Sequence, residues 1–275
     1  MPRKRVTQIF PMLLPFRKRQ RAFCFYLGMH LDKNRYTNSF SKIILPYKVF
    51  ETSCPLYNQK TGFDMVYQQN KVFNLKLAAA KLHTLIIRPG ETFSFWKAIR
   101  HADKPTPYKD GLTMKDGILT TEYGGGMCQM SNLLFWMFLH TPLTILERRG
   151  HGIKDFPEPP SDAPMGVDAT VSLGWIDLKV KNATEYTFQI CIAFDEERIT
   201  GSVFSDKDMG CHYEIKNGDL IYYRENNIVY EQVEVWKNQI SNTTNQKMNS
   251  ALVYKNVCKI GYKLPDHIKV IKKDG

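Results

Sequence analysis

A cysteine that follows three glycines is the residue of this chain best placed for chemistry. The run 124–126 leads into Cys128 and then into the apolar block 133–139. A block that is apolar all round predicts a buried helix, which would begin near Cys128 and end before Pro142. The first turn of a helix favours a thiolate through its unpaired N–H groups and the positive end of its dipole. Cys128 is therefore a candidate nucleophile.

The residues around this cysteine are candidates for holding a substrate. At Gly125 and Gly126 the absence of side chains lets a carbonyl group approach closely and leaves N–H groups to hold an oxyanion. Gln129 or the backbone amide of Cys128 could supply one such donor, and Ser131 is a further candidate substrate-binding residue. A competing interpretation is a small, unreactive buried cysteine in a glycine-rich bend.

A cysteine nucleophile needs a base, and His151 is the best candidate among the seven histidines. It follows a predicted strand at 143–149, and the glycines on either side would leave its ring room at the open end of a sheet. His101 is a weaker second choice for the base, and His140 is placed to cap the helix. Alternatively, His151 only forms a hydrogen bond within a turn.

A third group should orient the imidazole, and Asp168 is the best candidate for it, with Asp155 as the alternative. Either carboxylate could instead form an ordinary surface ion pair with Arg148 or Arg149. If the site is real, these two arginines are candidates for gripping a substrate carboxylate through a bidentate bond.

Hydrophobic spacing and turn signals predict the elements that must position these residues. Apolar residues at helical spacing predict a helix over 64–83, and the turn-rich residues 100–123 predict a long loop or loose hairpin. Alternating patterns after Pro142 predict an antiparallel meander. The predicted strands of the core are 85–87, 91–96, 143–149, 168–173, 176–181, 186–194 and 199–204.

Farther along the chain, Asn217-Gly218 predicts a hairpin turn, 228–236 a further strand, and the polar residues 241–250 a linker before a basic tail. The predicted fold class is α+β: helices packed on an antiparallel β meander, a nucleophile cysteine at a helix N-terminus, and extra C-terminal β hairpins. The predicted domains are a basic N-terminal lead and extension at 1–60, a core at 61–205, and a β-hairpin appendage with a basic tail at 206–275.

Charge is concentrated at the two ends of the chain. The 275 residues hold 38 basic and 27 acidic side chains, hence a net charge of +11. Residues 1–21 carry seven basic groups and no acid, and residues 247–275 carry seven lysines and two aspartates, which leaves the middle with a net charge of −1. No recognition motif accompanies the basic ends, so nucleic acid is not expected as a partner. The ends could instead contact an anionic membrane surface peripherally, or be ordinary solvated arms.

The sequence also indicates the cellular compartment in which the protein is expected. The longest apolar run without proline, 133–139, has seven residues, whereas a helix that crosses a bilayer needs about 18 or more. Two prolines interrupt the apolar start of the chain and no small-x-small cleavage site follows, so no secretion signal is expected. Six cysteines are too sparse for a disulfide scaffold and include no CxxC pair. We therefore expect a reduced, cytoplasmic protein, with possible membrane association and without a metal site or cofactor.

Four motifs resemble the VanW family in their order and spacing. They are PGETFSF at 89–95, GGGMCQMSNLLF at 124–135, ERRGHG at 147–152, and GVDATV at 166–171 followed by DLKVKN at 177–182. The block of glycines and cysteine is the specific part of the pattern, because PGETFSF alone is a weak signal. The similarity extends over most of the chain.

The resemblance implies a setting of vancomycin (glycopeptide) resistance and a chemistry. Some larger, exported proteins with a VanW domain are L,D-transpeptidases, whose motif cysteine joins peptidoglycan stem peptides. Carried over by position, Cys128 would be the nucleophile and His151 the matching histidine. We therefore expect a cysteine-dependent acyltransferase or hydrolase that acts on stem peptides or their precursors. The alternative is a non-catalytic accessory protein that binds wall precursors or partner enzymes at the membrane face through its basic ends.

Overall fold

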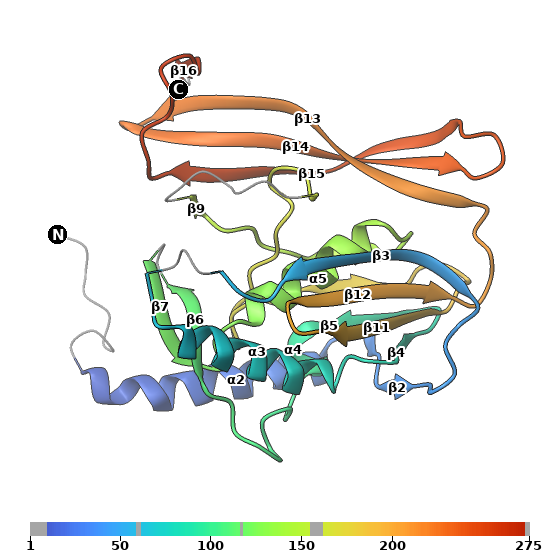
Figure 1. Ribbon diagram of the computed structural model, residues 1–275, viewed down its shortest axis with the longest axis horizontal. Helices are drawn as coiled ribbons and strands as arrows, with labels where there is room; N and C mark the ends of the chain where they lie inside the picture. Colours follow the sequence, from blue (N-terminus) through green and yellow to red (C-terminus); the bar gives the residue numbers. More distant parts are fainter. Residues whose placement is uncertain (1–9, 59–61, 116–117, 155–161, 273–275) are drawn as a thin grey trace.

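The computed structural model describes residues 10–58, 62–115, 118–154 and 162–272 (Figure 1). These residues contain a short 3₁₀ turn and four α-helices: η1 (Pro11–Leu13), α2 (Leu14–Leu31), α3 (Met65–Ala79), α4 (Phe95–Ala98) and α5 (Met127–Leu139). The strands are β1 (Arg35–Tyr36), β2 (Ser39–Phe40), β3 (Tyr47–Pro55), β4 (Leu85–Ile87), β5 (Glu91–Ser94), β6 (Asp110–Lys115), β7 (Ile118–Tyr123), β8 (Thr144–Glu147), β9 (Ile153–Lys154), β10 (Lys179–Lys181), β11 (Phe188–Phe194), β12 (Arg198–Ser205), β13 (Cys211–Glu225), β14 (Ile228–Ser241), β15 (Lys247–Ile260) and β16 (Val270–Lys272).

The strands of the described residues form three sheets and one separate hairpin, β6-β7. Their orders are β1-β5-β10-β8, β2-β4-β11-β12-β3 and β16-β13-β14-β15-β9. Pairing is antiparallel except between β1 and β5, β13 and β16, and β15 and β9. The predicted α+β class with mostly antiparallel sheets is therefore confirmed.

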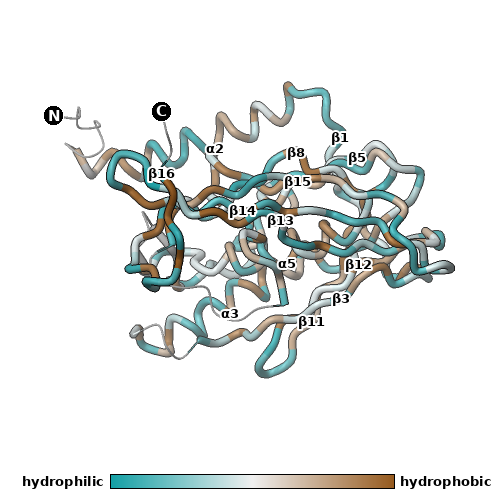
Figure 2. Tube along the Cα trace, turned by 90° about the horizontal axis from the view of Figure 1, so that it is seen from above, coloured by the Kyte–Doolittle hydropathy of each residue, from teal (hydrophilic) through white to brown (hydrophobic). Residues whose placement is uncertain are grey.

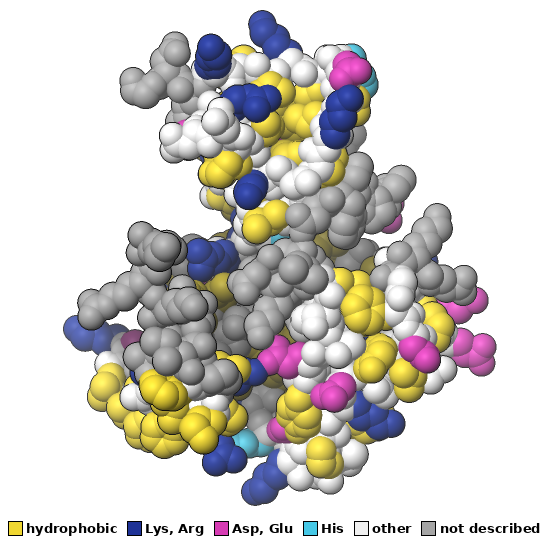
Figure 3. All heavy atoms as spheres, turned by 90° about the vertical axis from the view of Figure 1, so that its left-hand side faces the viewer, with side chains coloured by type: hydrophobic (Ala, Val, Ile, Leu, Met, Phe, Trp, Pro, Cys, Tyr) yellow, Lys and Arg dark blue, Asp and Glu magenta, His cyan; other side chains and the backbone are white. Residues whose placement is uncertain are grey.

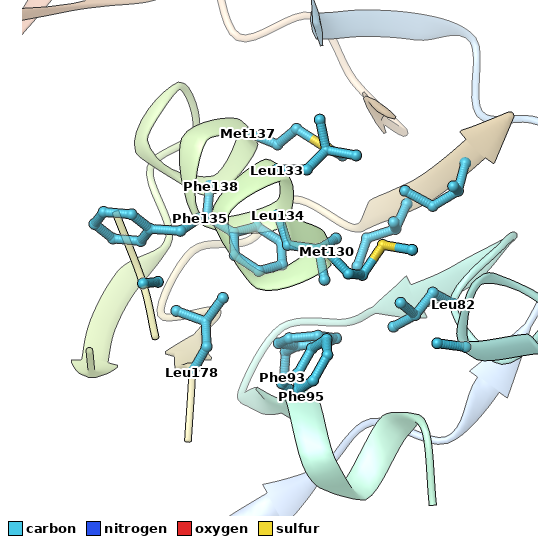
Figure 4. Close-up of a cluster of buried hydrophobic side chains, with 14 of the residues drawn as sticks. Leu82, Phe93, Phe95, Met130, Leu133, Leu134, Phe135, Met137, Phe138 and Leu178 are labelled. Atoms are coloured by element: carbon cyan, nitrogen blue, oxygen red, sulfur yellow. The ribbon is translucent and has the colours of Figure 1, made fainter. Parts of the chain in front are cut away.

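Helix α5 lies in the middle of the hydrophobic core (Figure 4). As predicted for a block that is apolar all round, the helix is buried and ends before Pro142. On one side Phe138 packs edge-on against Phe93 of β5, with 5.1 Å between the ring centroids. On another side the helix approaches β12 so closely that a Cβ at Gly201 would lie 2.4 Å from the Met137 sulfur. The core thus fixes the position at which α5 begins.

Helix α3 forms within the predicted stretch 64–83 but ends earlier, at Ala79. Asp64 caps it by accepting a hydrogen bond from the Val66 N–H at 2.9 Å. Val72, Leu75 and neighbouring alanines are buried against the core. The helix also contacts β6 and α5, and its Lys71 side chain lies against Gly126 at the start of α5.

The predicted single meander over 143–204 is wrong. Strands β8 and β10 belong to one sheet, whereas β11 and β12 belong to another. Residues 168–173 are not a strand and hold only an isolated bridge between Ser172 and Ile176. Their backbone bonds elsewhere, because the Ala169 N–H donates to the Asn132 side chain and the Thr170 N–H donates to the Arg149 carbonyl.

The predicted turn at Asn217-Gly218 is also wrong. Strand β13 continues through these residues with a shift of register, and the chain reverses at Asn226 and Asn227, both with positive φ. The predicted linker at 241–250 is instead a tight turn and the start of β15. The long strands β13, β14 and β15 make up most of the sheet at the top of Figure 1.

In the described part of the chain, no helix combines the length and apolar character needed to cross a membrane. Helix α2 lies along one edge of the molecule and mixes hydrophobic and hydrophilic residues (Figure 2).

Candidate active site

The sequence places Cys128 in the first turn of α5 through the glycine before it. Gly126 has a φ of 107°, a conformation that favours glycine. A Cβ there would also lie 2.4 Å from the Cγ of Lys71, so the close approach of α3 needs glycine as well. The first N–H groups of a helix have no partner within the helix. Cys128 therefore lies where backbone donors and the helix dipole favour a negative charge.

The structure brings Cys128, His151 and Asp168 together. The Cys128 thiol and the His151 ring lie close enough for each to shift the pKa of the other. The ring Nδ1 pairs with Asp168 Oδ2, and the His151 backbone N–H donates to the same oxygen at 2.7 Å. Two attachments to one carboxylate fix both the position and the orientation of the imidazole. A candidate nucleophile, a candidate base and an orienting carboxylate thus follow one another, and the base is hydrogen-bonded to the carboxylate.

The electrostatics of these three residues favour an ion pair. Burial opposes ionisation of Cys128, but the hydrogen bonds to His151 and Thr170 outweigh it and hold the pKa of the thiol below its ordinary 9.0. Hydrogen bonds to Asp168 and Cys128 raise the pKa of His151 to about 10. Burial also acts on Asp168, yet its hydrogen bond to His151 and the nearby charge of Arg148 lower its pKa. These shifts favour a thiolate beside an imidazolium, because the pKa of the thiol falls while that of the imidazole rises.

Arg148 supports Asp168 from the side away from the histidine. Its guanidinium donates to Asp168 Oδ1 at 2.6 Å, to the Asp168 carbonyl at 2.6 Å, to the Gly166 carbonyl at 2.7 Å and to Asn256 at 2.9 Å. It also lies 4.2 Å over the ring of Tyr254. The predicted role of Arg148 in gripping a substrate carboxylate does not fit this geometry, because the side chain is buried and already paired.

Two other residues predicted to bind substrate form hydrogen bonds to backbone carbonyl groups instead. The Ser131 side chain is fully buried, with its hydroxyl 2.5 Å from the Ala169 carbonyl oxygen. The Gly125 N–H donates to the Glu122 carbonyl at 2.9 Å and is not free for an oxyanion. The Ser131 hydroxyl and the Gly125 N–H are thus engaged with the backbone, while a close approach of a substrate to Gly125 stays a prediction. Gly126 remains a candidate, because it lines the pocket beside Cys128.

Gln129 and Arg149 have different surroundings. Gln129 lines the same pocket, but its Nε2 donates to the Pro55 carbonyl at 2.8 Å and lies 3.5 Å from the Cys54 sulfur. The predicted oxyanion donor is thus engaged with β3. Arg149 is exposed, and its proposed contact with a substrate stays a prediction.

The alternative bases are placed elsewhere. His140 forms the C-cap of α5 as predicted, with Nδ1 2.7 Å from the Tyr213 carbonyl oxygen. Burial lowers the pKa of His140 to about 4. His101 lies in an exposed turn after α4, and no contact within the described residues joins it to Cys128. Asp155, the alternative orienting acid, lies outside the described residues.

Sequence reasoning missed three polar residues around the site. Thr170 has its hydroxyl 3.5 Å from the Cys128 sulfur. Lys71 and Gln68, on α3, line the pocket of about 200 Å³ that also includes Cys128. Thr170 belongs to the GVDATV motif, which was a signal for it, whereas the two α3 residues resembled the ordinary polar face of a helix. Over the ranges that the structure describes, no group of three His, Cys, Asp or Glu side chains could hold a metal ion.

Comparison with known proteins agrees with the motifs. A family described as VanW like protein matches residues 70–204, a range that includes the three residues in contact at the site. The chain belongs to the VanW family. It is 57% identical over 270 residues to the Vancomycin B-type resistance protein VanW of Enterococcus faecalis, which covers 98% of each chain.

A more distant relative is the uncharacterized protein YoaR of Bacillus subtilis. It is 32% identical over 114 residues, which make up 42% of this chain and 36% of that protein. No solved structure matches the chain.

Proposed function

We propose that this chain is a cysteine-dependent acyltransferase of the L,D-transpeptidase type, or a related hydrolase, that acts on peptidoglycan stem peptides or their precursors in vancomycin resistance. The observation that carries the proposal is the contact of Cys128 with His151, whose ring is held by Asp168. The setting is supported by the 57% identical relative, which is described as a vancomycin resistance protein.

The chemistry follows from the charge states of the pair. The Cys128 thiolate attacks the carbonyl carbon of a peptide bond, so that a C–S bond forms while backbone N–H groups at the start of α5 stabilise the oxyanion. The C–N bond then breaks, and the His151 imidazolium gives its proton to the leaving amine. In the second half, an acceptor amine or water attacks the thioester. It loses a proton to His151, and Cys128 leaves as the thiolate.

A tetrapeptide stem as acyl donor would connect the proposed reaction with resistance to glycopeptides. An acyl-enzyme formed from a tetrapeptide leads to 3→3 cross-links, which do not require the terminal D-Ala-D-Ala that glycopeptides bind. A cell that uses such links would be less dependent on the target of the antibiotic.

Replacement of the thiol tests the proposal in cells. Wall fragments from a strain that carries Cys128→Ala should lose 3→3 linked peptides in mass spectra, and the strain should lose resistance. Cys24→Ala is the matched control, because Cys24 is exposed on α2. Unchanged cross-links and unchanged resistance in the Cys128→Ala strain would contradict the proposal.

A second candidate function, an accessory protein at the membrane face, is favoured by the surface of α2. Phe16, Phe23, Leu27 and Leu31 follow helical spacing and are exposed. Figure 3 views the end of the molecule at which α2 begins and shows hydrophobic side chains beside Lys and Arg. An accessory role predicts that deletion of residues 1–21 abolishes membrane association and resistance while Cys128→Ala leaves both unchanged.

A further inference from the structure

A pocket beside Cys128 is built from three elements that meet at the start of α5. Helix α3 contributes Gln68 and Lys71, the β6-β7 hairpin contributes Leu112, and α5 contributes Gly126 with Cys128. Its volume of about 200 Å³ is several times the share of one water molecule in the liquid, about 30 Å³. The pocket therefore has room for part of a ligand, directly beside the proposed nucleophile.

Lys71 brings a positive charge to this pocket. Its stem lies along Gly126, where even a Cβ would come within 2.4 Å of the lysine Cγ. No carboxylate of the described residues pairs with its ammonium group, and burial lowers the pKa of Lys71 to about 8. A cation that is partly removed from water, with no carboxylate partner among those residues, is suited to bind an anion.

Gln68 brings an acceptor that has no partner within the described residues. The residue is 1% exposed, and its Nε2 donates to the Asn58 carbonyl at 3.0 Å. Its Oε1 is buried and accepts no hydrogen bond there. Buried acceptors are almost always satisfied, so a donor supplied by a ligand would complete this side chain.

We propose that the pocket binds the C-terminal residue of the acyl donor, with its carboxylate on Lys71 and its amide N–H on the Gln68 oxygen. This inference rests on the proposed function and names the substrate class as peptides that end in a free carboxylate. A C-terminal residue carries an N–H donor and a carboxylate close together, which is the pair of groups that Gln68 and Lys71 complement. The same residue becomes the leaving amine when Cys128 attacks the carbonyl before it.

Binding to an inactive full-length chain tests the inference without turnover. Calorimetry on Cys128→Ala would compare a stem tetrapeptide that ends in D-Ala with the same peptide that ends in D-alaninamide. The free acid should bind about tenfold more tightly, as expected for a hydrogen bond to a charged group. Equal affinities, or no binding of either peptide, would overturn the inference.

Variants of the lysine show whether Lys71 causes the discrimination. Lys71→Met keeps the stem that packs on Gly126 and should remove the preference for the acid, while Lys71→Arg should retain most of it. Lys76→Met is the control, because Lys76 lies on the same helix and is exposed. A preference for the acid that survives Lys71→Met would overturn the assignment.

The two proposals fail in different ways. If the wild-type chain forms a thioester equally well from both peptides, the proposed function stands and the carboxylate pocket is wrong. If the free acid binds preferentially but no thioester forms, the pocket is supported and acyl transfer is contradicted.

Discussion

At the scale of single residues, the reactivity of Cys128 depends on the contacts that His151 makes with Asp168. The carboxylate of Asp168 is bonded to both the ring and the backbone of His151. This arrangement raises the pKa of His151 to about 10 and lowers that of Cys128 from its ordinary 9.0. The ion pair should form as the pH rises through the pKa of Cys128 and be lost as it rises through that of His151.

Alkylation of Cys128 as a function of pH should reveal this pair. In the wild type, iodoacetamide should modify Cys128 well below pH 8, because the reactive form is the thiolate. His151→Gln removes the cationic partner, so burial should then raise the pKa of the thiol and slow alkylation at pH 7 about tenfold or more. Modification is followed by peptide mass spectrometry, with exposed Cys24 as the internal reference. An identical pH profile in the variant would contradict the ion pair.

Arg148 should prove important for stability. Arg148→Met removes the charge that pairs with Asp168 at 2.6 Å in a poorly exposed position. Loss of one partner from such a pair is expected to lower the free energy of unfolding by about 3 kcal/mol. Arg149→Met, at the exposed neighbouring position, should change it by less than about 0.5 kcal/mol. Urea unfolding measures both, and equal effects would show that Arg148 does not hold the site.

Cys128 and His151 could be singled out from the sequence because each carries a local signal, whereas the strand expected to begin at Asp168 does not form. A glycine run before an apolar helix marked Cys128, and flanking glycines marked His151. The adjacent arginines gave no such signal, because spacing alone does not show that one side chain is buried and the other exposed. Lys71 was missed for a related reason, since its importance comes from the tertiary contact with Gly126.

At the scale of elements, the position of α5 depends on glycines that allow backbones to touch. A Cβ at Gly125 would lie 2.1 Å from the Gly111 carbonyl oxygen of β6. Gly125→Ala should therefore destabilise the chain by about 1–3 kcal/mol, because a backbone atom cannot move away as a flexible side chain can. Gly28→Ala in α2 is the control, with nothing within 4 Å of the added atom, and it should be neutral or slightly stabilising. Thermal unfolding with no loss in Gly125→Ala would contradict this packing.

Two wrong predictions at this scale have physical explanations. Gly218 lies within β13 and makes room for a ring, since a Cβ there would lie 2.5 Å from the Trp236 indole nitrogen. Its presence therefore reflects packing and not a turn. Asn217 accepts from the Met165 N–H and donates to the Met165 carbonyl, both at 2.9 Å, so its side chain holds a distant loop. Local turn propensity was overridden by contacts that no short window of sequence contains.

At the scale of the whole molecule, α2 combines an exposed apolar stripe with the basic residues Arg17, Lys18 and Arg19. This combination favours binding to an anionic bilayer surface. Phe23→Glu with Leu27→Glu should weaken flotation with anionic vesicles several-fold, and added salt should weaken flotation of the wild type. Met248→Glu, an exposed apolar position on β15, is the control. Flotation that is unaffected by both the double change and salt would contradict a membrane role for α2.

The most direct test of acyl transfer is the mass of the protein after incubation with a stem tetrapeptide. We expect an adduct equal to the tetrapeptide without its terminal D-Ala, mapped to Cys128 as a thioester and absent from Cys128→Ala. The adduct should disappear when an acceptor amine is added. A folded wild-type chain that binds the tetrapeptide but never gains this mass on Cys128 would contradict the central claim.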